Sequence, residues 1–475
     1  MLIKIDRLES QIETDNPKLL KALSDLYSVT DKNARYVPAY KRGFWDGKKR
    51  FLSATTGKFG TGLLPRVLRD LSKLDDLNIE LDYLYEADPP QLFDFTLEGW
   101  DFRDYQSDYV QRALSDKRCV IQAPTGAGKT LMMAAIIKAL GKRKIIVLFN
   151  QKQLLEQTYR YLTDPAPKGV DITNRYGISV GVAYGEGFEY GDVMLTSVFS
   201  LEKIIGTPHE SAEVLMVDEV HEFCTGKLTS GAIKAFPMAE YRYGFTATPP
   251  RDQMKALTLE SAIGPTIQEV TTKQLIEDES LAKPFIHVTP ISCKDPEIEF
   301  ENCAGMSYAE VYDKYIVHNN HRNRYIREIC ENIENGNVLL LVQSLDHAHE
   351  LHSLIPNSYQ IEGQDCLQTR KKAIKDFLDH DGTSVLIGTR ILQTGINIPE
   401  ITHLINARGL KSEVATIQAL GRSLRKSDVS KHIQVYDFMD NPRYLENHSV
   451  SRLRHYKREG HDIEILDDVE YHYEG

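Results

Sequence analysis

The stretch RCVIQAPTGAGKTLMMAAIIKAL, residues 118–140, decides the fold class of this chain. It reads as an apolar strand, a glycine-rich turn and an apolar helix in direct succession. Gly126 and Gly128 let backbone N–H groups converge on phosphate oxygens, and the start of the helix adds its positive dipole end. We expect Lys129 to reach the β- and γ-phosphates of a nucleotide and the Thr130 hydroxyl to ligate Mg²⁺.

The turn departs from the strict phosphate-loop motif at its first position, where Ala123 stands in place of glycine. A GxGK turn in another context would be weak evidence. Here the turn joins an apolar strand to an apolar helix, and this context argues against a coincidental turn. We therefore expect the segment that includes Pro124, Thr125 and Ala127 to bind the phosphates together with the glycines.

A pair of adjacent carboxylates follows a second apolar run. LMVDEVHE, residues 215–222, reads as a buried strand whose carboxyl end presents Asp218 and Glu219. Such a pair can divide its tasks: Asp218 holds Mg²⁺ and its water shell, while Glu219 orients and deprotonates an attacking water. Isolated acidic pairs usually lie on a solvated surface, but a pair that ends a buried strand downstream of a phosphate loop indicates nucleotide hydrolysis.

A third element near the end of the chain supplies positive charge. ATIQALGRSLRKS, residues 415–427, places Gln418, Arg422 and Arg425 at spacings of four and three, on one face of a helix. Arginines so placed can act as fingers on the transferring phosphoryl group, and hydrolysis then depends on closure of two lobes. Read alone, the segment is a basic helix face; together with the other two elements it indicates a catalytic role.

Short apolar runs alternate with helical segments from about residue 100 onward. This alternation predicts an α/β fold with parallel sheets. Two consecutive sets of runs imply two lobes in tandem, with the change near residues 280–290. The expected strands are RCVIQAP, KIIVLFN, DVMLTS, EVLMVDE and YRYGFTAT in the first set, and NVLLLVQ, SVLIGT, THLINA and HIQVYDF in the second.

The start of the chain shows a different pattern of strand, helix, turn, helix and strand, which predicts a small α/β domain. Asn16 is the expected N-cap of its first helix and Pro17 the first helical residue. The expected division is a small basic domain at 1–88, an acidic linker with prolines at 89–99, lobes at 100–284 and 285–440, and a C-terminal basic helix with an acidic tail at 441–475.

Composition excludes several classes of protein. The six cysteines form no CxxC pair and no cluster with histidine, which argues against structural zinc and a disulfide scaffold and fits a reducing compartment. The N-terminus is interrupted by charge, so we expect no signal peptide. The sequence contains no run of about 18 apolar residues, so we expect no membrane span. We expect a cytoplasmic protein with no membrane partner.

Eight segments in order resemble the motifs of superfamily-2 helicases of the DExH type, over about residues 100–440. The segments are RDYQ (103–106), APTGAGKT (123–130), FNQKQLLEQT (149–158), TSVFSL (196–201), DEVH (218–221), FTATPP (245–250), GTRILQTGINIP (388–399) and QALGRSLR (418–425). The resemblance implies two RecA-like lobes with ATP and Mg²⁺ in the cleft between them, preceded here by the small domain.

The resemblance also implies roles for individual residues. Gln106 would read adenine, with Arg103 and Gly395 also in the nucleotide site. The residues implied to couple the state of ATP to nucleic acid are His221, Thr246 and Thr248. The residues implied to grip the backbone of one strand are Gln151, Thr196, Ser197, Thr389, Arg390, Gln393 and Thr394.

The N-terminal domain narrows the resemblance. FWDGKKRFL (44–52) and FGTGLLPRVLRDL (59–71) are similar to the N-terminal module of bacteriophage recombination helicases of the UvsW kind. Those helicases remodel branched DNA in replication, recombination and repair: they migrate junctions, regress forks and unwind R-loops or D-loops, with 3′-to-5′ polarity. The resemblance implies branched or forked DNA and RNA–DNA hybrids as partners. Two alternatives stay open: an RNA-directed DExH helicase, and a duplex-DNA translocase that does not separate strands.

Positive charge is concentrated in this domain. Residues 1–73 carry 15 Lys and Arg against 8 Asp and Glu, whereas residues 74–102 carry nine acids and no Lys or Arg. A basic module before an acidic connector suggests a local polyanion site, although an acidic linker can also simply be well solvated.

The segment KRGFWDGKKR, residues 41–50, holds five of these cations around an aromatic pair. We expect Trp45 to lie in the domain core and Asp46 to fix a turn; a competing view places Phe44 in the core as well. The residues expected to contact duplex DNA, with a strongly salt-dependent affinity, are Lys41, Arg42, Lys48, Lys49 and Arg50.

Overall fold

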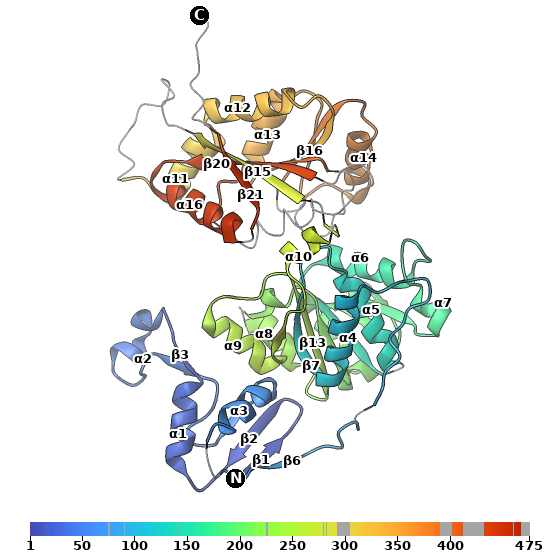
Figure 1. Ribbon diagram of the computed structural model, residues 1–475, viewed down its shortest axis with the longest axis vertical. Helices are drawn as coiled ribbons and strands as arrows, with labels where there is room; N and C mark the ends of the chain where they lie inside the picture. Colours follow the sequence, from blue (N-terminus) through green and yellow to red (C-terminus); the bar gives the residue numbers. More distant parts are fainter. Residues whose placement is uncertain are drawn as a thin grey trace, which may run out of the picture. The chain divides into compact units, whose positions relative to one another are not determined.

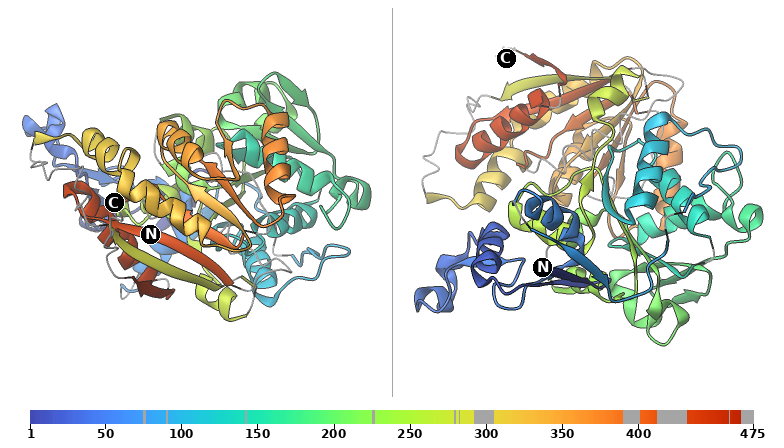
Figure 2. Two further views of the ribbon diagram at one scale, coloured as in Figure 1. Left: turned by 90° about the horizontal axis from the view of Figure 1, so that it is seen from above. Right: turned by 60° about the horizontal axis from the view of Figure 1, so that its bottom comes forward.

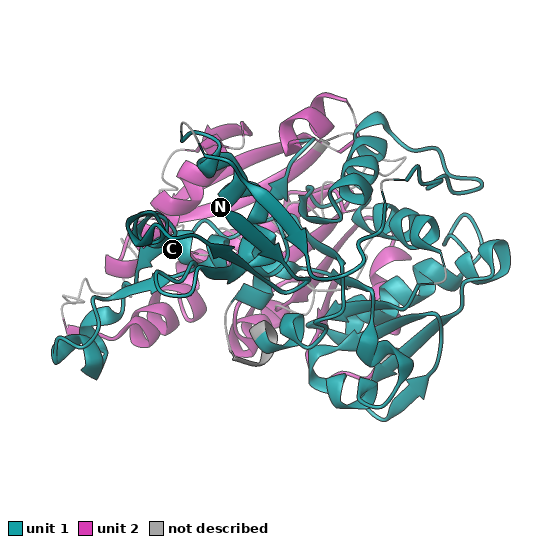
Figure 3. Cartoon of the chain, turned by 90° about the horizontal axis from the view of Figure 1, so that it is seen from below, with its two compact units in different colours: residues 1–270 teal, residues 271–475 magenta. Residues whose placement is uncertain are grey.

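The computed structural model contains two compact units, residues 1–270 and residues 271–475 (Figure 3). Unit 1 holds the small N-terminal domain and the first α/β lobe, and unit 2 holds the second lobe. The residues that the structure describes are 1–74, 77–89, 91–141, 143–224, 227–278, 280–281, 283–291, 305–389, 401–411, 432–458 and 460–466.

The first lobe is built on a largely parallel sheet with the strand order β10-β9-β11-β8-β12-β13-β7-β14. Neighbouring strands are parallel except β10, which pairs antiparallel with β9 at one edge. All five strands expected here are confirmed. The strands are β7 (Arg118–Gln122), β8 (Ile145–Phe149), β9 (Val180–Tyr184), β10 (Gly187–Glu189), β11 (Val193–Ser197), β12 (Val214–Val217), β13 (Tyr241–Thr246) and β14 (Thr266–Ile267).

Helices cover both faces of this sheet, with α4 and α5 on one side and α8 and α9 on the other (Figure 1). Burial on both faces explains why β8 and β12 consist entirely of buried apolar residues rather than alternating ones. The helices are α4 (Asp104–Asp116), α5 (Lys129–Leu140), α6 (Lys152–Thr163), α7 (Ile172–Tyr176), α8 (Lys227–Lys234) and α9 (Gln253–Ala262), with the 3₁₀ segments η3 (Val198–Ile204), η4 (Pro208–Ser211) and η5 (Val220–Cys224).

The N-terminal domain is a small α/β domain, as its pattern predicts, with a sheet in the order β5-β2-β1-β6 and a separate ribbon of β3 and β4. Asn16 caps α1 as expected, because its side chain accepts the backbone N–H of Leu19 at 3.1 Å. The elements are β1 (Leu2–Ile5), β2 (Glu9–Glu13), α1 (Pro17–Leu26), β3 (Ser28–Thr30), η1 (Ala34–Tyr36), α2 (Pro38–Lys41), β4 (Lys48–Arg50), β5 (Lys58–Gly60), η2 (Thr61–Leu63), α3 (Leu64–Leu71) and β6 (Glu80–Tyr83).

The N-terminal domain is docked on the first lobe through α9. A Cβ atom added to Gly60 would lie 2.1 Å from the Ser261 Oγ, and one added to Gly62 would lie 2.0 Å from the Glu260 carbonyl oxygen. The Arg66 guanidinium donates to both oxygens of the Glu260 carboxylate, at 2.8 and 2.6 Å. Leu257 of α9 belongs to the hydrophobic core of the N-terminal domain, so the two parts share packed apolar surface.

The segment expected as a linker lies along the first lobe. The Tyr176 hydroxyl oxygen accepts the Glu98 backbone N–H at 2.6 Å. Trp100 packs on Tyr161, with ring centroids 5.7 Å apart. Lys138 of α5 forms an ion pair with Asp94. The connector is thus held by polar and aromatic contacts rather than left only to solvent.

Unit 2 is built on a parallel sheet in the order β17-β18-β16-β19-β20-β15-β21. The four strands expected for the second lobe are confirmed as β16, β18, β19 and β20. The elements are α10 (Thr272–Glu277), β15 (Lys283–Ile291), α11 (Tyr308–Tyr312), the π-helical η7 (Asp313–Val317), α12 (Asn320–Glu331), β16 (Gly336–Leu341), α13 (Leu345–Leu354), β17 (Ser358–Ile361), α14 (Leu367–Leu378), β18 (Thr383–Gly388), β19 (His403–Asn406), β20 (His432–Asp440), α16 (Arg443–Arg458) and β21 (Asp462–Ile465).

The C-terminal basic helix is built into unit 2. α16 covers the expected helix but packs against β20, and β21 pairs with β15 at the edge of the sheet. Arg452 is 3% exposed, and its Nε donates to the Asp437 carboxylate at 2.9 Å. Tyr456 donates to the same carboxylate at 2.6 Å. These buried contacts show that part of the basic charge of this helix serves folding.

Candidate nucleotide and nucleic-acid sites

The glycine-rich turn between β7 and α5 forms a cradle of backbone N–H groups at the start of a helix. Gly126 and Gly128 both have φ of 87°, in the left-handed region that favours glycine. A Cβ atom at Gly128 would lie 2.4 Å from the Gln106 Nε2. The turn therefore favours glycine at both positions for their conformation, and it leads directly into the N-terminus of α5, the positive end of that helix.

The lysine expected to bind phosphate lies beside this turn. The Lys129 Nζ donates to the carbonyl oxygens of Ala123 and Pro124, at 3.1 and 3.3 Å. Ala127 is buried, whereas Pro124, Thr125 and Thr130 are half-buried at the same turn. Phosphate oxygens are stronger acceptors than these carbonyl groups because they are charged, so a bound nucleotide can take over the lysine.

The predicted adenine reader braces the same turn. Gln106 is 5% exposed, and its Nε2 donates to the Ala127 carbonyl at 2.8 Å. Its Oε1 accepts the Arg103 backbone N–H at 3.0 Å and so caps α4. Beyond these two bonds, Nε2 has a second N–H and Oε1 a second lone pair with which to contact adenine. Sequence reasoning missed Tyr105, whose hydroxyl donates to the Ala127 carbonyl at 3.1 Å.

The paired carboxylates follow β12, in the same sheet as β7. The Asp218 Oδ1 accepts the Glu219 backbone N–H at 3.0 Å. Burial, together with the neighbouring Glu219 charge, raises the pKa of Asp218 to about 7, although the Lys129 charge opposes this shift. Glu219 has φ of 45°, a strained conformation for a residue other than glycine.

Within the described part of the chain, one oxygen of this pair accepts no hydrogen bond. This atom, the Glu219 Oε2, is buried and lies 3.4 Å from the His221 Nδ1. A buried acceptor without a donor is costly and indicates that a water or ligand belongs beside it. The glycine cradle, the lysine and this carboxylate together fit a nucleoside triphosphate with its divalent ion.

The three residues implied to couple ATP to nucleic acid meet beyond these carboxylates. The His221 Nδ1 shares a 2.8 Å hydrogen bond with the Thr246 Oγ1 at the end of β13. The Thr248 backbone N–H donates to the same hydroxyl at 3.0 Å. Sequence reasoning missed a parallel link, in which the Asn150 Nδ2 donates to the Glu222 Oε2 at 2.7 Å and joins the end of β8 to η5.

The residues implied to grip a strand differ in their exposure. Thr196 is fully buried and donates to the Ala183 carbonyl at 2.9 Å, so the structure contradicts a nucleic-acid contact by its hydroxyl. The Ser197 hydroxyl accepts the Phe199 backbone N–H at 3.2 Å and caps η3. Gln151 is half-buried at the start of α6.

Several predicted residues lie outside the described part of the chain. Thr389 is described, half-buried, directly after β18. The predicted residues outside the described ranges are Arg390, Gln393, Thr394, Gly395, Gln418, Arg422 and Arg425.

The basic segment forms a turn in which one cation is paired with carboxylates. Asp46 fixes the turn as expected: its Oδ1 accepts the Lys48 backbone N–H at 3.1 Å. Arg50 donates to both Asp46 oxygens, at 3.1 and 2.6 Å, and this bond lowers the pKa of Asp46 to about 2. Arg50 also lies 3.5 Å from Asp25. Arg50 is exposed and shares its charge with these two carboxylates, so its contact with DNA stays a prediction.

Lys49 is directed toward the first lobe. Its Nζ donates to the Thr258 Oγ1 of α9 at 3.3 Å, and partial burial with the nearby Lys234 charge lowers its pKa. Lys49 is exposed as well, so this bond joins it to α9 while its contact with DNA stays a prediction. Lys41, Arg42 and Lys48 are exposed and form no ion pair among the described residues.

Neither aromatic residue of this segment lies in the core of the domain, although Trp45 was expected there and a competing view placed Phe44 there as well. Trp45 is half-buried and donates its Nε1–H to the Lys48 carbonyl at 2.8 Å, outside the main core of the domain. It packs edge-on against Tyr40, with ring centroids 6.4 Å apart. Phe44 is 84% exposed, which contradicts the view that it lies in the core.

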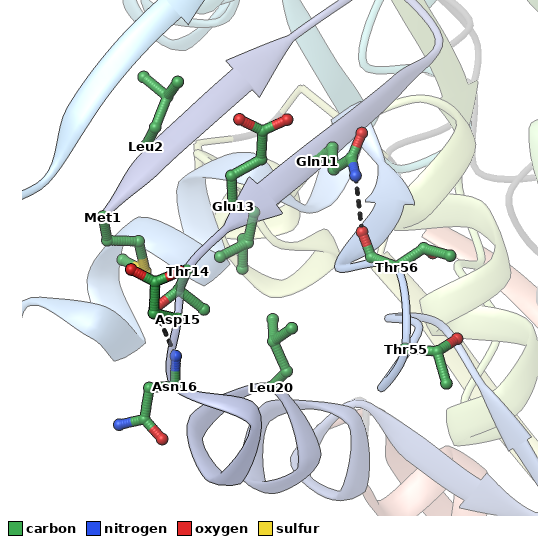
Figure 4. Close-up of a pocket in the computed structure, with 11 residues that line it drawn as sticks. Met1, Leu2, Gln11, Glu13, Thr14, Asp15, Asn16, Leu20, Thr55 and Thr56 are labelled. Atoms are coloured by element: carbon green, nitrogen blue, oxygen red, sulfur yellow. Dashed lines mark hydrogen bonds between the residues drawn. The ribbon is translucent and has the colours of Figure 1, made fainter.

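The N-terminal domain contains a pocket with charged residues in its lining. It lies between the start of β1, the end of β2 and the turn at 55–56, where the Gln11 Nε2 donates to the Thr56 carbonyl (Figure 4). Glu13 and Asp15 bring negative charge to its lining. Met1, with its ammonium group, also lines the pocket, and Lys4 pairs with Glu13, so the lining is of mixed charge. The basic turn, which is richer in cations, remains the candidate DNA contact of this domain.

Two further observations concern other classes of site. Among the described residues, no three His, Cys, Asp or Glu side chains are grouped to hold a metal ion. A Mg²⁺ held by one or two protein oxygens together with phosphates does not require such a group. Nor does the described part of the chain include a helix long and apolar enough to cross a bilayer.

Two family models match this chain. The model described as type III restriction enzyme, res subunit, matches residues 100–251, and the helicase conserved C-terminal domain matches residues 321–427. Together with the two parallel-sheet lobes and the ordered motifs, these matches identify the chain as an ATP-dependent helicase of superfamily 2.

Known proteins that are similar to this chain agree with this assignment. The chain is 23% identical to the ATP-dependent DNA helicase uvsW of Enterobacteria phage T4, over 92% of this chain and 93% of that protein. It is also 23% identical to the DNA 3′-5′ translocase XPB2 of Sulfurisphaera tokodaii, over 69% of this chain and 79% of the relative. A solved structure of S. cerevisiae Dbp5 bound to RNA and ADP BeF3 has the same fold, with a TM-score of 0.54 at 15% identity, over 77% of this chain and 89% of that one.

Proposed function

We propose that this helicase uses ATP to remodel branched or forked DNA. The proposed reactions are migration of junctions, regression of forks, and unwinding of R-loops or D-loops. The observation that carries this proposal is the basic turn of the N-terminal domain, which exposes its cations and is docked through α9 on the lobe that holds the phosphate loop. The similarity to a phage DNA helicase over nearly the whole chain supports the choice of DNA.

The nucleotide site would work through the residues of the first lobe. Lys129 and the cradle of Gly126 and Gly128 would bind the phosphates of ATP. Asp218 and the Thr130 hydroxyl would hold Mg²⁺, which supplies neutralising charge when it is bound. Glu219 would orient the attacking water and accept its proton, because one of its oxygens is buried without a donor.

Closure of the two lobes would complete this site. We propose that Arg422 and Arg425 bring positive charge to the transferring phosphoryl group and that Gln418 contributes its neutral amide beside them, so that hydrolysis depends on closure. Gly395 would belong to the same site. The His221 and Thr246 hydrogen bond supports a coupling role, because it links the carboxylate strand to the end of β13.

The nucleic-acid path would use two kinds of contact. Lys41, Arg42 and Lys48 would bind the phosphates of duplex DNA beside a branch point. The residues proposed to follow the backbone of one strand on the lobes are Gln151, Ser197, Thr389, Arg390, Gln393 and Thr394.

The test compares the stimulation of ATP hydrolysis by matched polynucleotides. We expect forked DNA and four-way junctions to stimulate the purified protein more than single-stranded DNA, blunt duplex DNA or RNA of equal length. Stronger stimulation by RNA would instead support an RNA-directed helicase. ATP hydrolysis on DNA without any strand separation would support a translocase, and both results would contradict the proposal.

A further inference from the structure

The N-terminal domain carries an arm, residues 28–50, that comprises β3, η1, α2 and β4. The arm projects from the rest of the domain in each view (Figures 1 and 2). Its base is anchored on α9, where Lys32 forms a 2.7 Å ion pair with Asp252 and Lys49 contacts Thr258. Its outer part is therefore held in a defined place on unit 1.

The outer part of the arm exposes aromatic rings. Phe44 is 84% exposed, Tyr36 is 64% exposed and Tyr40 is 44% exposed. A single exposed apolar side chain is common on a protein surface, but here three exposed rings are grouped between residues 36 and 44. Such a group is a candidate contact surface. The core of the domain does not need this ring, because Phe44 packs with none of its members.

The backbone fixes the position of Phe44. Its N–H donates to the Ala39 carbonyl at 2.9 Å, and Gly43 before it has φ of 74°. On the other side, Trp45 and Asp46 bond to the carbonyl and the N–H of Lys48. The ring thus extends from a turn that is closed on both sides, so little ordering entropy would be lost when it binds.

Cations surround these rings. Lys41, Arg42 and Lys48 are exposed on the same short segment, and the Arg35 guanidinium lies 4.8 Å from the centre of the Tyr36 ring. Exposed rings among cations are the features with which proteins bind unpaired nucleotides: rings stack on bases, and cations bind phosphates. An intact duplex offers no free base face along its length, whereas a branch point does.

We propose that Phe44 stacks on an unpaired base at a DNA branch while the neighbouring cations hold the adjacent duplex. This proposal rests on the proposed function and adds to it a contact that distinguishes branched from intact DNA. Phosphate contacts alone carry no such distinction, because every duplex presents phosphates.

The test measures the affinity of the full-length protein, without nucleotide, for a forked DNA and a blunt duplex of equal length. Phe44→Ala is expected to weaken binding to the fork about 10-fold, in keeping with the loss of one stacked base. Its affinity for the blunt duplex is expected to stay within about twofold, and the salt dependence should not change because no charge is removed. Phe44→Trp should restore binding to the fork, since a larger ring can also stack.

Two control variants separate stacking from charge and from general exposure. Lys48→Ala should weaken binding to both DNAs and reduce the salt slope by about one. Phe188→Ala removes a ring that is 48% exposed on β10, far from the arm in the sequence, and should leave both affinities unchanged. A second readout is the fluorescence of 2-aminopurine at the branch, which the parent protein should change and Phe44→Ala should not.

The contradicting outcomes are distinct. If Phe44→Ala binds the fork as tightly as the parent does, or loses equal affinity for the fork and the blunt duplex, Phe44 does not read unpaired bases. If the parent itself shows no preference for branched DNA, the proposed function fails first. Equal thermal stability of the parent and Phe44→Ala is expected, because the ring is outside the core.

Discussion

Glu219 combines two features that are costly at a residue without a function. Its backbone lies at a positive φ, and one of its carboxylate oxygens is buried and accepts no hydrogen bond from the residues that the structure describes. Strain and an unsatisfied acceptor at the same residue persist only where surrounding structure enforces them, and they are typical of functional sites.

Glu219→Gln is expected to lower the rate of ATP hydrolysis at least about 100-fold, because the amide cannot accept the proton of the attacking water. ATP binding should be retained, since the phosphate loop is unchanged, and both quantities can be measured on the same preparation. Glu210→Gln, in η4, is the matched control and should hydrolyse ATP at the parent rate. Hydrolysis by Glu219→Gln at that same rate would remove the general base from our account.

The role of a residue was predictable from the sequence where a local pattern determines that role. Asn16 and Asp46 bond to backbone groups two or three residues away, so their roles follow from their own segments. The contact of Lys49 with Thr258 joins residues 209 positions apart, and no local pattern reveals it. The predicted nucleic-acid contact of Thr196 was wrong for a related reason, because its hydroxyl bonds to the Ala183 carbonyl of β9.

At the scale of elements, α9 connects the nucleotide site with the N-terminal domain. It follows the segment of Thr246 and Thr248, packs against η5, and contacts η2 and β5 of the N-terminal domain. The close approach depends on two glycines of the FGTGLL sequence, Gly60 and Gly62. The local sequence assigns these glycines no role of their own, because the helix that approaches them lies about 200 residues further along the chain.

Gly62→Ala is expected to destabilise unit 1 by about 2 kcal/mol, since its Cβ would lie 2.0 Å from a backbone oxygen of α9. Chemical denaturation monitored by circular dichroism measures this change. Gly231→Ala is the control: nothing lies within 4 Å of the added Cβ in α8, so we expect equal or slightly higher stability. An unchanged stability of Gly62→Ala would show that α9 is not packed against η2 in solution.

The second sheet contains a histidine that should make stability depend on pH. Burial, together with the His287 charge, lowers the pKa of His403 to about 4, and its Nδ1 shares a 2.8 Å hydrogen bond with the Thr402 hydroxyl. An unfolded histidine titrates near 6.5, so the folded state binds fewer protons between these two values. The stabilising contribution is therefore complete above about pH 6.5 and is lost as the pH falls toward 4.

Between pH 7.5 and pH 5.5, we expect the free energy of unfolding to fall by about 1 kcal/mol less in His403→Gln than in the parent. Unfolding of the full chain at the two pH values gives this difference directly. His349 is an exposed histidine on α13, and His349→Gln should leave most of the pH dependence in place. If His403→Gln and the parent lose stability equally, His403 is not buried in its neutral form.

At the scale of the whole chain, sequence was sufficient for the class of protein and for the strand pattern of both lobes. Alternating apolar runs predict parallel sheets because burial on both faces removes the polar alternation. The connector and the C-terminal helix were not predictable in the same way. Asp94 and Arg452 are charged residues of the kind that usually faces solvent, and only the folded chain brings Lys138 and Asp437 to them.

The most direct test of the central claim is the movement of a synthetic four-way DNA junction by the purified protein, followed as separation of labelled strands. We predict that the parent separates the strands of the junction when ATP and Mg²⁺ are present, and that it does not do so without ATP or when Glu219 is replaced by Gln. Strand separation that proceeds equally without ATP hydrolysis would contradict the account. So would a protein that hydrolyses ATP on junctions but never separates their strands.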